Sequence, residues 1–217
     1  MVEQLQYIIS IVSISNILTR ILDTIAPPRA TDTLVRELEL DELRALTLRG
    51  DKSGSLPYHD ARVRALVWEL KYFAHKRAAA LAGAILSDIL IGIASESLGK
   101  PLLIPIPMHA ARHRERGHNQ TEVLCEAALV HAKDFFEYKP RVLVRIKATP
   151  QQQGLHKSER ERNLTNAMKI FSKKDIEGRV CVVIDDVSTT GATFAEATRA
   201  LHEAGAREVI CVALAYS

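Results

Sequence analysis

One stretch decides the fold of this chain: Val180-Cys-Val-Val-Ile-Asp-Asp-Val-Ser-Thr-Thr-Gly-Ala-Thr193. Its first five residues are apolar, and four of them are β-branched. A run this short and unbroken predicts a strand buried on both faces, as in a parallel sheet that is covered by helices. Asp185 and Asp186 follow, then a hydroxyl-rich turn, and a helix is expected over residues 192–204. The stretch therefore predicts an α/β fold.

The hydroxyl-rich turn has the composition of a phosphate site. Backbone N–H groups at a helix start have no partner within the helix, and the helix dipole adds partial positive charge there. Gly191 lets the backbone approach an anion closely, and the hydroxyls of Thr189, Thr190 and Thr193 can donate to phosphate oxygens. The simpler alternative is that these hydroxyls only cap the helix. The full order of strand, acidic pair, turn and helix favours the phosphate site.

The two carboxylates before the turn define the rest of the ligand. Asp185 and Asp186 would repel a phosphate, so they must face sugar hydroxyls or a metal ion. A ribose 5-phosphate satisfies both halves of the stretch, with its phosphate in the turn and its 2′- and 3′-hydroxyls toward the carboxylates. The stretch therefore predicts a site for a phosphorylated ribose.

The same residues resemble the phosphoribosyl-pyrophosphate (PRPP) signature of type I phosphoribosyltransferases. The spelling Asp-Asp-Val-Ser-Thr-Thr-Gly-Ala-Thr is similar to that of the ComF family within this group. The resemblance implies that Asp185 and Asp186 are catalytic. It also implies a loop for the 5′-phosphate made of Val187, Ser188, Thr189, Thr190, Gly191, Ala192 and Thr193.

The rest of the chain alternates between patterns of strands and helices. This alternation predicts a mainly parallel, doubly wound sheet with its ligand site at the carboxyl ends of the strands. We expect further strands over residues 102–106, 141–146, 168–171 and 209–215, and helices over residues 33–46, 59–78, 81–93 and 121–133.

Composition limits the classes of function. The 217 residues are 47% hydrophobic and 25% charged, which is typical of a soluble globular protein. The formal net charge of +3 gives no reason to expect a protein that coats nucleic acid. Cys125, Cys181 and Cys211 lie far apart, so we expect neither disulfides nor structural zinc. No secretory signal is apparent, and we expect a cytoplasmic protein.

A basic segment follows the strand expected at residues 102–106. Arg112, Arg114 and Arg116 can offer planar, multidentate donors to phosphate oxygens. The alternatives are a basic surface turn or a nucleic-acid patch, but no aromatic residue interleaves with these arginines. His109, His113 and His118 lack partnering Cys or Asp residues, which argues against a metal site in this loop.

This segment is similar to the ComF pyrophosphate loop. The resemblance implies that pyrophosphate contacts Met108, His109, Arg112 and Arg116. Two positions depart from the family's pattern: His118 stands where an aromatic residue is usual, and Ala111 where an arginine is often found. The family also carries a Lys-Tyr pair at the position of Lys71-Tyr72, which makes Lys71 a candidate site residue instead of a solvated lysine.

Residues 147–164 are polar and carry several cations. By composition they are either a plain connection or a mobile lid that closes over a charged site. They resemble the ComF run Thr-Pro-x-Gln-x-Gly-Leu followed by Arg-x-x-Asn-Leu, which favours the lid. The resemblance implies that a flexible loop contributes Gln152, Arg160 and Asn163.

The N-terminal part departs from the family. Residues 1–27 carry apolar side chains at helical spacing and are a helix packed on the body, an oligomer interface or an interfacial membrane helix. The polar face lacks the set of Lys and Arg residues that membrane-surface helices favour, which ranks the membrane last. ComF-like proteins commonly begin with a zinc ribbon, but no cysteine precedes Cys125. We therefore expect no zinc. We expect a helical hood over residues 1–57, held by apolar burial alone, and a phosphoribosyltransferase-like domain over residues 58–217.

Three functions remain open. In the first, the chain transfers the phosphoribosyl group of PRPP to an unknown nitrogen nucleophile and releases pyrophosphate, with Mg²⁺ bridging substrate oxygens and no side chain assigned as a direct metal ligand. In the second, the same site binds PRPP or a nucleotide without turnover, or the protein acts in DNA uptake, as the ComF name implies. In the third, the cations of residues 112–116 and 157–162 bind DNA. A second copy of the chain and a DNA-uptake machinery are candidate partners.

Overall fold

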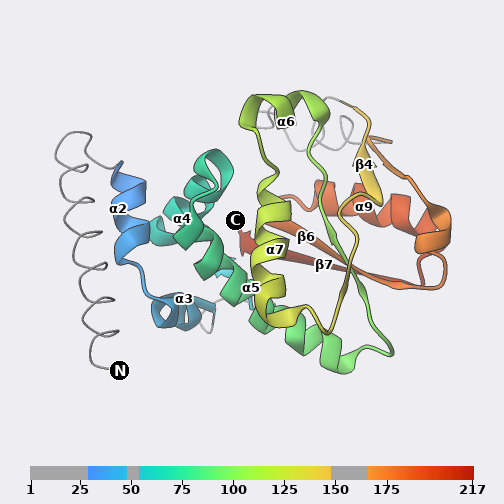
Figure 1. Ribbon diagram of the computed structural model, residues 1–217, viewed down its shortest axis with the longest axis horizontal. Helices are drawn as coiled ribbons and strands as arrows, with labels where there is room; N and C mark the ends of the chain where they lie inside the picture. The colour runs from blue at the N-terminus through green and yellow to red at the C-terminus, as the bar shows by residue number, and fades with distance from the viewer. Residues whose placement is uncertain (1–28, 48–53, 148–165) are drawn as a thin grey trace, which may run out of the picture.

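The centre of the molecule is a parallel sheet. A computed structural model describes residues 29–47, 54–147 and 166–217, and within these ranges five strands pair in the order β1-β7-β6-β2-β3, every pair parallel. Figure 1 shows the sheet flanked by helices, with β6 and β7 running through its middle. The strands are β1 (Leu56–Pro57), β2 (Leu102–Pro105), β3 (Glu137–Tyr138), β6 (Val180–Ser188) and β7 (Glu208–Tyr216). The predicted parallel α/β fold is confirmed.

Strand β6 is buried on both faces, which explains its unbroken apolar run. Side chains alternate along a strand. Val182 and Ile184 pack into the cluster that includes α5 (Lys76–Glu96) and α7 (Gln120–Ala132). Cys181 and Val183 pack on the opposite face against α9 (Ala192–Glu203). All four side chains are fully buried.

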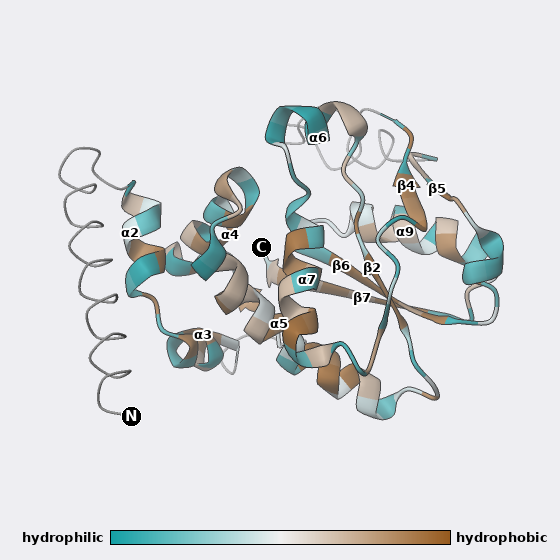
Figure 2. Ribbon diagram, viewed as in Figure 1, coloured by the Kyte–Doolittle hydropathy of each residue, from teal (hydrophilic) through white to brown (hydrophobic). Residues whose placement is uncertain are grey.

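Two layers cover the sheet. One consists of α5 and α7 with α4 (Ala61–Phe73) beside them, and the other of α9 with a separate antiparallel hairpin of β4 (Leu143–Arg145) and β5 (Met168–Ile170). Figure 2 shows hydrophobic residues concentrated where α5, α7 and the central strands meet. The remaining elements are α2 (Ala30–Glu37), α3 (Leu40–Thr47), α6 (Ala110–Arg116) and a 3-10 turn, Lys173–Asp175.

Helices α5 and α7 approach each other unusually closely at a glycine. A Cβ atom built on Gly83 would lie 2.6 Å from Ala127 Cβ and 2.7 Å from the Ala127 carbonyl carbon. Real Cβ atoms do not come this close, so only glycine fits at this crossing. In the described part of the chain, α5 is also the one helix long and apolar enough to cross a membrane. Its packing against α7 and the sheet accounts for that apolar composition.

Three expected boundaries differ from the structure. The helix expected at residues 59–78 ends at Phe73, because Ala74 adopts a left-handed conformation with φ 44°, and α5 then begins with His75 Nδ1 accepting from Ala78 N at 3.3 Å. The helix expected at residues 33–46 is two helices, α2 and α3. Arg77 stabilises the break between them by donating to the carbonyls of Val35 and Leu38. The basic loop at residues 110–116 is the short helix α6.

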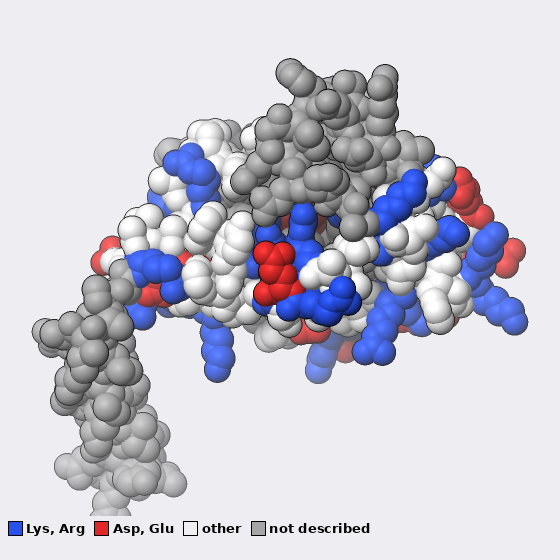
Figure 3. All heavy atoms as spheres, turned by 90° about the horizontal axis from the view of Figure 1, so that it is seen from above, with Lys and Arg blue, Asp and Glu red and all other residues white. Residues whose placement is uncertain are grey.

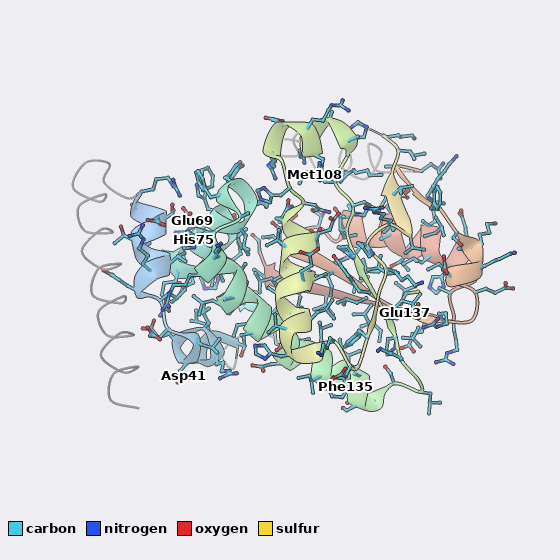
Figure 4. All side chains as sticks on the ribbon, viewed as in Figure 1. Asp41, Glu69, His75, Met108, Phe135 and Glu137 are labelled. Carbon is cyan, nitrogen blue, oxygen red and sulfur yellow. The ribbon has the colours of Figure 1, made fainter. Side chains whose placement is uncertain are left out.

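Polar contacts join the segment around α2 to α4 and to the start of α5, so the expectation that apolar burial alone holds this layer is wrong. Glu69 of α4 is fully buried and accepts from Arg29 Nη2 at 3.0 Å and Thr31 Oγ1 at 2.7 Å. Asp32 is 5% exposed and lies 3.0 Å from both Arg36 Nε and His75 Nε2. Figure 4 shows Glu69 and His75 between α2 and α4. Helix α2 packs on α4, whereas α3 packs against α5 and strand β1.

Candidate functional site

The two aspartates lie at the carboxyl end of the central strand. Asp185 and Asp186 belong to β6, which continues through Ser188, and they are only 9% and 4% exposed. Their side chains fix the local backbone: Asp186 N donates to Asp185 Oδ1, and Val187 N donates to Asp186 Oδ1, both at 2.9 Å. Two adjacent buried carboxylates are costly unless charges or ligands compensate them.

Lys71 supplies part of that compensation. Its Nζ atom lies 2.9 Å from Asp186 Oδ2, and the two side chains are 27% and 6% exposed. Burial alone would lower the pKa of Lys71, but the charge of Asp186 and the hydrogen bond to it outweigh burial, so the pKa is raised. The lysine is therefore charged at neutral pH and joins α4 to the sheet at the acidic pair.

Asp185 has weaker compensation. Burial, and next the charge of the adjacent Asp186, raise the pKa of Asp185 well above its ordinary value, and the more distant Lys71 only partly opposes them. A carboxyl group in this state gains from any ligand that brings hydroxyl donors or positive charge. The pair is thus divided: Asp186 contacts the ammonium group of Lys71, whereas Asp185 is short of a donor.

The turn after β6 begins α9 with a glycine. Gly191 has φ 73°, in the left-handed region that glycine favours, and it carries no side chain that could cap the helix. Thr190 Oγ1 makes only a long contact, 3.4 Å, with Ala192 N. Ser188 is buried and its carbonyl accepts from Ser217 N at 3.1 Å, while Thr189 is exposed. The amide groups at the start of α9 are thus presented beside exposed hydroxyls.

The predicted pyrophosphate residues belong to α6 and the segment before it. His109 is the N-cap of α6, because its Nδ1 accepts from Ala111 N at 3.2 Å. Met108 lies between β2 and α6 (Figure 4). The Arg116 guanidinium lies 4.8 Å from the centre of the Tyr72 ring on α4. His118 strengthens the same junction, with Nε2 2.9 Å from the Leu70 carbonyl and Nδ1 3.1 Å from the Arg116 carbonyl.

Arg145, at the end of β4, is a charged residue near the acidic pair that the sequence did not reveal. Burial, and next the nearby charge of Arg112, lower the pKa of Arg145, while Asp185 and Glu196 act in the opposite direction. Arg112, Arg145 and Asp185 therefore share one electrostatic neighbourhood although they come from α6, β4 and β6. From the sequence, residues 141–146 were predicted only as a strand. The one signal for Arg145 was its place near the end of that strand.

The predicted flexible-loop residues Gln152, Arg160 and Asn163 lie outside the described residues. The ends of their segment are described, and they lie beside the turn. Ile146 N donates to the Ala167 carbonyl at 2.8 Å, and Ala167 packs against Ala192, the first residue of α9. The segment thus leaves and rejoins the fold next to the predicted phosphate turn, and its role as a lid stays a prediction.

The acidic pair fits a Mg²⁺ ion held mainly by substrate. Within the described ranges no three His, Cys, Asp or Glu side chains come together to hold a metal ion. Magnesium, however, is commonly bound through one or two carboxylates, waters and substrate phosphates, not by a protein cage. Asp185 and Asp186 match that donor set. The expectation that zinc is absent from the chain stays a prediction.

The central strand, the acidic pair and the glycine-led helix start define a class of protein. Residues 76–217 match the family described as phosphoribosyl transferase domain, and the chain belongs to this family. The matched region begins after α4, so Lys71 lies outside it.

Within that class, the ComF resemblance is confirmed by curated relatives. The chain is 36% identical over 148 residues to the DNA utilization protein YhgH of Salmonella typhi, covering 66% of this chain and 63% of the relative. It is 35% identical over 104 residues to competence protein ComFC of Bacillus subtilis, covering 48% of this chain and 39% of the relative. The chain thus spans less than two thirds of the length of these relatives.

A solved phosphoribosyltransferase from Corynebacterium diphtheriae is also similar. It is 16% identical, with a TM-score of 0.39 over 83% of this chain and 81% of that one. A TM-score this low supports no conclusion about the fold, which is described here from its strand order alone.

Proposed function

We propose that this protein binds PRPP with Mg²⁺ at the carboxyl end of β6 and transfers its phosphoribosyl group to a nitrogen nucleophile, releasing pyrophosphate. One observation carries the proposal: two buried, adjacent carboxylates are followed within a few residues by a left-handed glycine that begins a helix. One ligand can use both the acidic pair and the anion site only if it carries hydroxyls for the carboxylates and a phosphate for the helix start. Membership in the phosphoribosyl transferase domain family supports the same ligand.

The chain's own groups divide the work. The amides at the start of α9 and the hydroxyls of Thr189 and Thr190 would hold the 5′-phosphate. Asp185 and Asp186 would accept hydrogen bonds from the ribose hydroxyls, and their charge would stabilise the positive charge that develops at C1. Arg112 would lie against the leaving pyrophosphate. Bound Mg²⁺, held by the carboxylates and substrate, would supply further positive charge to the pyrophosphate oxygens.

The reaction balances without an added oxidant or reductant. The lone pair of the acceptor nitrogen forms the new bond to C1 as the bond from C1 to the pyrophosphate oxygen breaks. That electron pair leaves with the pyrophosphate, and the proton lost by the nitrogen passes to water or to the leaving group. Arg145, in the neighbourhood of Arg112 and Asp185, would add positive charge near the acidic pair.

Calorimetry with PRPP and Mg²⁺ tests binding. Wild type is expected to bind, and Asp185→Asn to bind at least about tenfold more weakly, since hydrogen bonds to a charged group are lost. Glu208→Gln is the matched control, because Glu208 is exposed at the opposite end of the sheet, where β7 begins. Equal affinity in wild type and Asp185→Asn, or no heat at all, would overturn the proposal.

A second candidate is a non-catalytic role in DNA uptake. It is favoured by relatives that are named DNA utilization protein and competence protein, and by the arginines on α6. Pyrophosphate release with a panel of amines and bases separates the two, because PRPP binding without release under any acceptor supports the second. Direct DNA binding would instead fall with salt and with Arg112→Ala and Arg114→Ala, while Asp185→Asn would leave it unchanged.

A further inference from the structure

A hollow lies between α9 and the β4-β5 hairpin, on the face of the sheet opposite α5 and α7. It has a volume of about 280 Å³. Three segments line it: strand β5 with Asn166 before it, Lys173 of the 3-10 turn, and the second half of α9. None of its lining residues belongs to the predicted PRPP site. The hollow is therefore a second place where a ligand can bind.

The lining of the hollow is mainly basic. Its charged residues are three cations and one carboxylate: Lys169, Lys173, Arg199 and Glu203. Glu203 contributes little net negative charge, because Arg199 Nη1 lies 2.7 Å from its Oε1. Figure 3, which keeps the horizontal axis of Figure 1, shows Lys and Arg side chains predominating at the end of the molecule where β4 and α9 lie. The charge of the hollow therefore favours an anion.

The two lysines are available to a ligand. Both are exposed, and in the described ranges neither forms an ion pair. Asp175, the acid nearest to Lys173 along the chain, lies 3.6 Å from Lys139 instead. Lys169 and Lys173 come from different elements, and only the fold brings them to one hollow. Two ammonium groups match the charge of a phosphate monoester, roughly −1.5 to −2 at pH 7, better than the single charge of a carboxylate.

Arg199 forms a fixed wall of the hollow. Its Nε and Nη2 atoms donate to Glu196 at 2.9 and 2.8 Å, and Nη2 also lies 3.2 Å from the Met168 carbonyl oxygen. Glu196 is buried and accepts from Met168 N at 2.9 Å. These two side chains thus satisfy the backbone of β5 at Met168 and fix the strand against α9. A wall that is already in place lowers the cost of ordering a site on binding.

The rest of the lining is apolar. Met168, Ala200 and Ala204 are buried, and Ile170 packs partly buried against the same cluster. Apolar surface beside unpaired cations suits a ligand that joins an anionic group to an apolar body. The volume of about 280 Å³ lies at the small end of the range for ligand pockets, roughly 300–1,000 Å³, which favours a small metabolite over a polymer.

The hollow adjoins the predicted phosphate turn through one residue. Asn166 and Met168 line the hollow, and Ala167 between them packs against Ala192, the first residue of α9. Glu196, which holds Met168 N, lies one turn further along α9 from Ala192. A ligand that orders Asn166 and Met168 therefore also orders the residue that contacts the helix start. When one ligand orders a shared segment, a second ligand pays less to order it, which gives positive cooperativity.

We propose that this hollow binds a small phosphate ester, and that the bound ester is an effector of the PRPP site. The phosphate lies between Lys169 and Lys173, and the body of the ester lies on Met168, Ile170 and the alanines of α9. Binding in the hollow is independent of the proposed function, whereas the effector role rests on it. By linkage, PRPP with Mg²⁺ raises the affinity of the hollow for the ester by the same factor.

Calorimetry on the full chain tests the hollow with three probes: phenyl phosphate, benzoate and inorganic phosphate. Phenyl phosphate carries both a phosphate monoester and an apolar body. Benzoate lacks the phosphate, and inorganic phosphate lacks the body. We expect phenyl phosphate to bind most tightly of the three.

Variants locate the bound probe. Lys169→Gln and Lys173→Gln are each expected to weaken binding of phenyl phosphate about tenfold, since a contact between opposite charges is lost. Lys174→Gln is the matched control, because Lys174 is the next residue and is also exposed but does not line the hollow. Labelling of amines, read by mass spectrometry, gives a second measurement: the probe is expected to protect Lys173 and to leave Lys174 reactive.

The results for the probes and variants decide the site. It is overturned if phenyl phosphate does not bind, or if Lys173→Gln and Lys174→Gln bind it equally well. Benzoate binding as tightly as phenyl phosphate overturns the assignment of a phosphate. Inorganic phosphate binding as tightly overturns the assignment of an ester.

The effector role is measured separately. In wild type, phenyl phosphate is expected to raise the affinity for PRPP with Mg²⁺ about fivefold, and Lys173→Gln is expected to abolish the gain. Unchanged PRPP affinity overturns the effector role. A loss of PRPP affinity that persists in Lys173→Gln shows the probe competing at the phosphate turn and overturns that role too. If PRPP does not bind at all, the proposed function fails, and the hollow is still decided by binding of phenyl phosphate to the lysine variants.

Discussion

The helices on the two sides of α4 are held by opposite means. Toward the N-terminus, α2 is joined to α4 through the buried Glu69 carboxylate, which accepts from Arg29 and Thr31. Toward the sheet, α5 packs against α7 so closely that a glycine is required at Gly83. The contact between α2 and α4 depends on charge and hydrogen-bond geometry. The contact between α5 and α7 depends on the volume of the side chains at their crossing.

The difference matters because α4 carries Lys71, which contacts Asp186. A helix held by volume is fixed at one separation, while a helix held by a few ion pairs depends on each of them. The site therefore combines a half built on β6 and α9 with a half on α4, which packs on the core through Leu66 and Leu70 and is joined to α2 by a small polar network. Three predictions test this contrast, from the largest expected effect to the smallest.

Removing Arg29 should have the largest effect on stability. Arg29→Ala leaves the Glu69 carboxylate buried with only Thr31 as a donor, and we expect a loss of about 2–3 kcal/mol in the free energy of unfolding. Chemical denaturation measures it. Arg44→Ala is the control, because its pair with Asp88 is about half exposed on both sides and contributes little. An equal, small effect of both variants would show that the N-terminal contact does not depend on the buried pair.

Two glycines of the same helix should respond with opposite signs. Gly83→Ala pushes a methyl group into Ala127 and should destabilise the protein by about 1–3 kcal/mol. Gly92→Ala meets no atom within 4 Å and should stabilise by about 0.5–1 kcal/mol, since alanine is the better helix former. Thermal unfolding compares them. If both stabilise, α5 and α7 are not in the close contact described.

Asp185→Asn should weaken PRPP binding and yet stabilise the protein. The raised pKa of Asp185 means that the folded state binds this proton more tightly than the unfolded state. Its contribution to stability therefore falls as pH rises from the ordinary value of 3.8 toward the raised folded value. At neutral pH we expect Asn to gain on the order of 1 kcal/mol, with a flatter dependence of stability on pH. Lower stability at neutral pH would contradict this account of the site.

The sequence was most informative where one local pattern determined the structure. The run before Asp185 predicted a strand buried on both faces, because only such a strand tolerates apolar residues at successive positions. The same stretch contained the acidic pair, the glycine and the helix start in order. The expected ends of the helices were less accurate, since a left-handed Ala74 carries no sequence signal of the kind that glycine gives.

The contacts that the sequence missed all join distant elements. Tyr72 meets Arg116, and Arg145 lies near Arg112 and Asp185, only because the fold brings separate elements to one edge. Glu69 follows Leu66 by three residues, so helical spacing alone could have placed it beside the buried stripe and indicated a buried partner.

The family's domain begins at residue 76, and this boundary passes between Lys71 and the acid that it neutralises. A fragment cut at that boundary would keep the whole central strand but expose two uncompensated carboxylates at its edge. Such a fragment would attract cations to that edge and would be less soluble where Leu66 and Leu70 had packed. Activity measurements on excised domains of this kind would then report a chemically different surface, and the helix before the boundary belongs in any comparison between relatives.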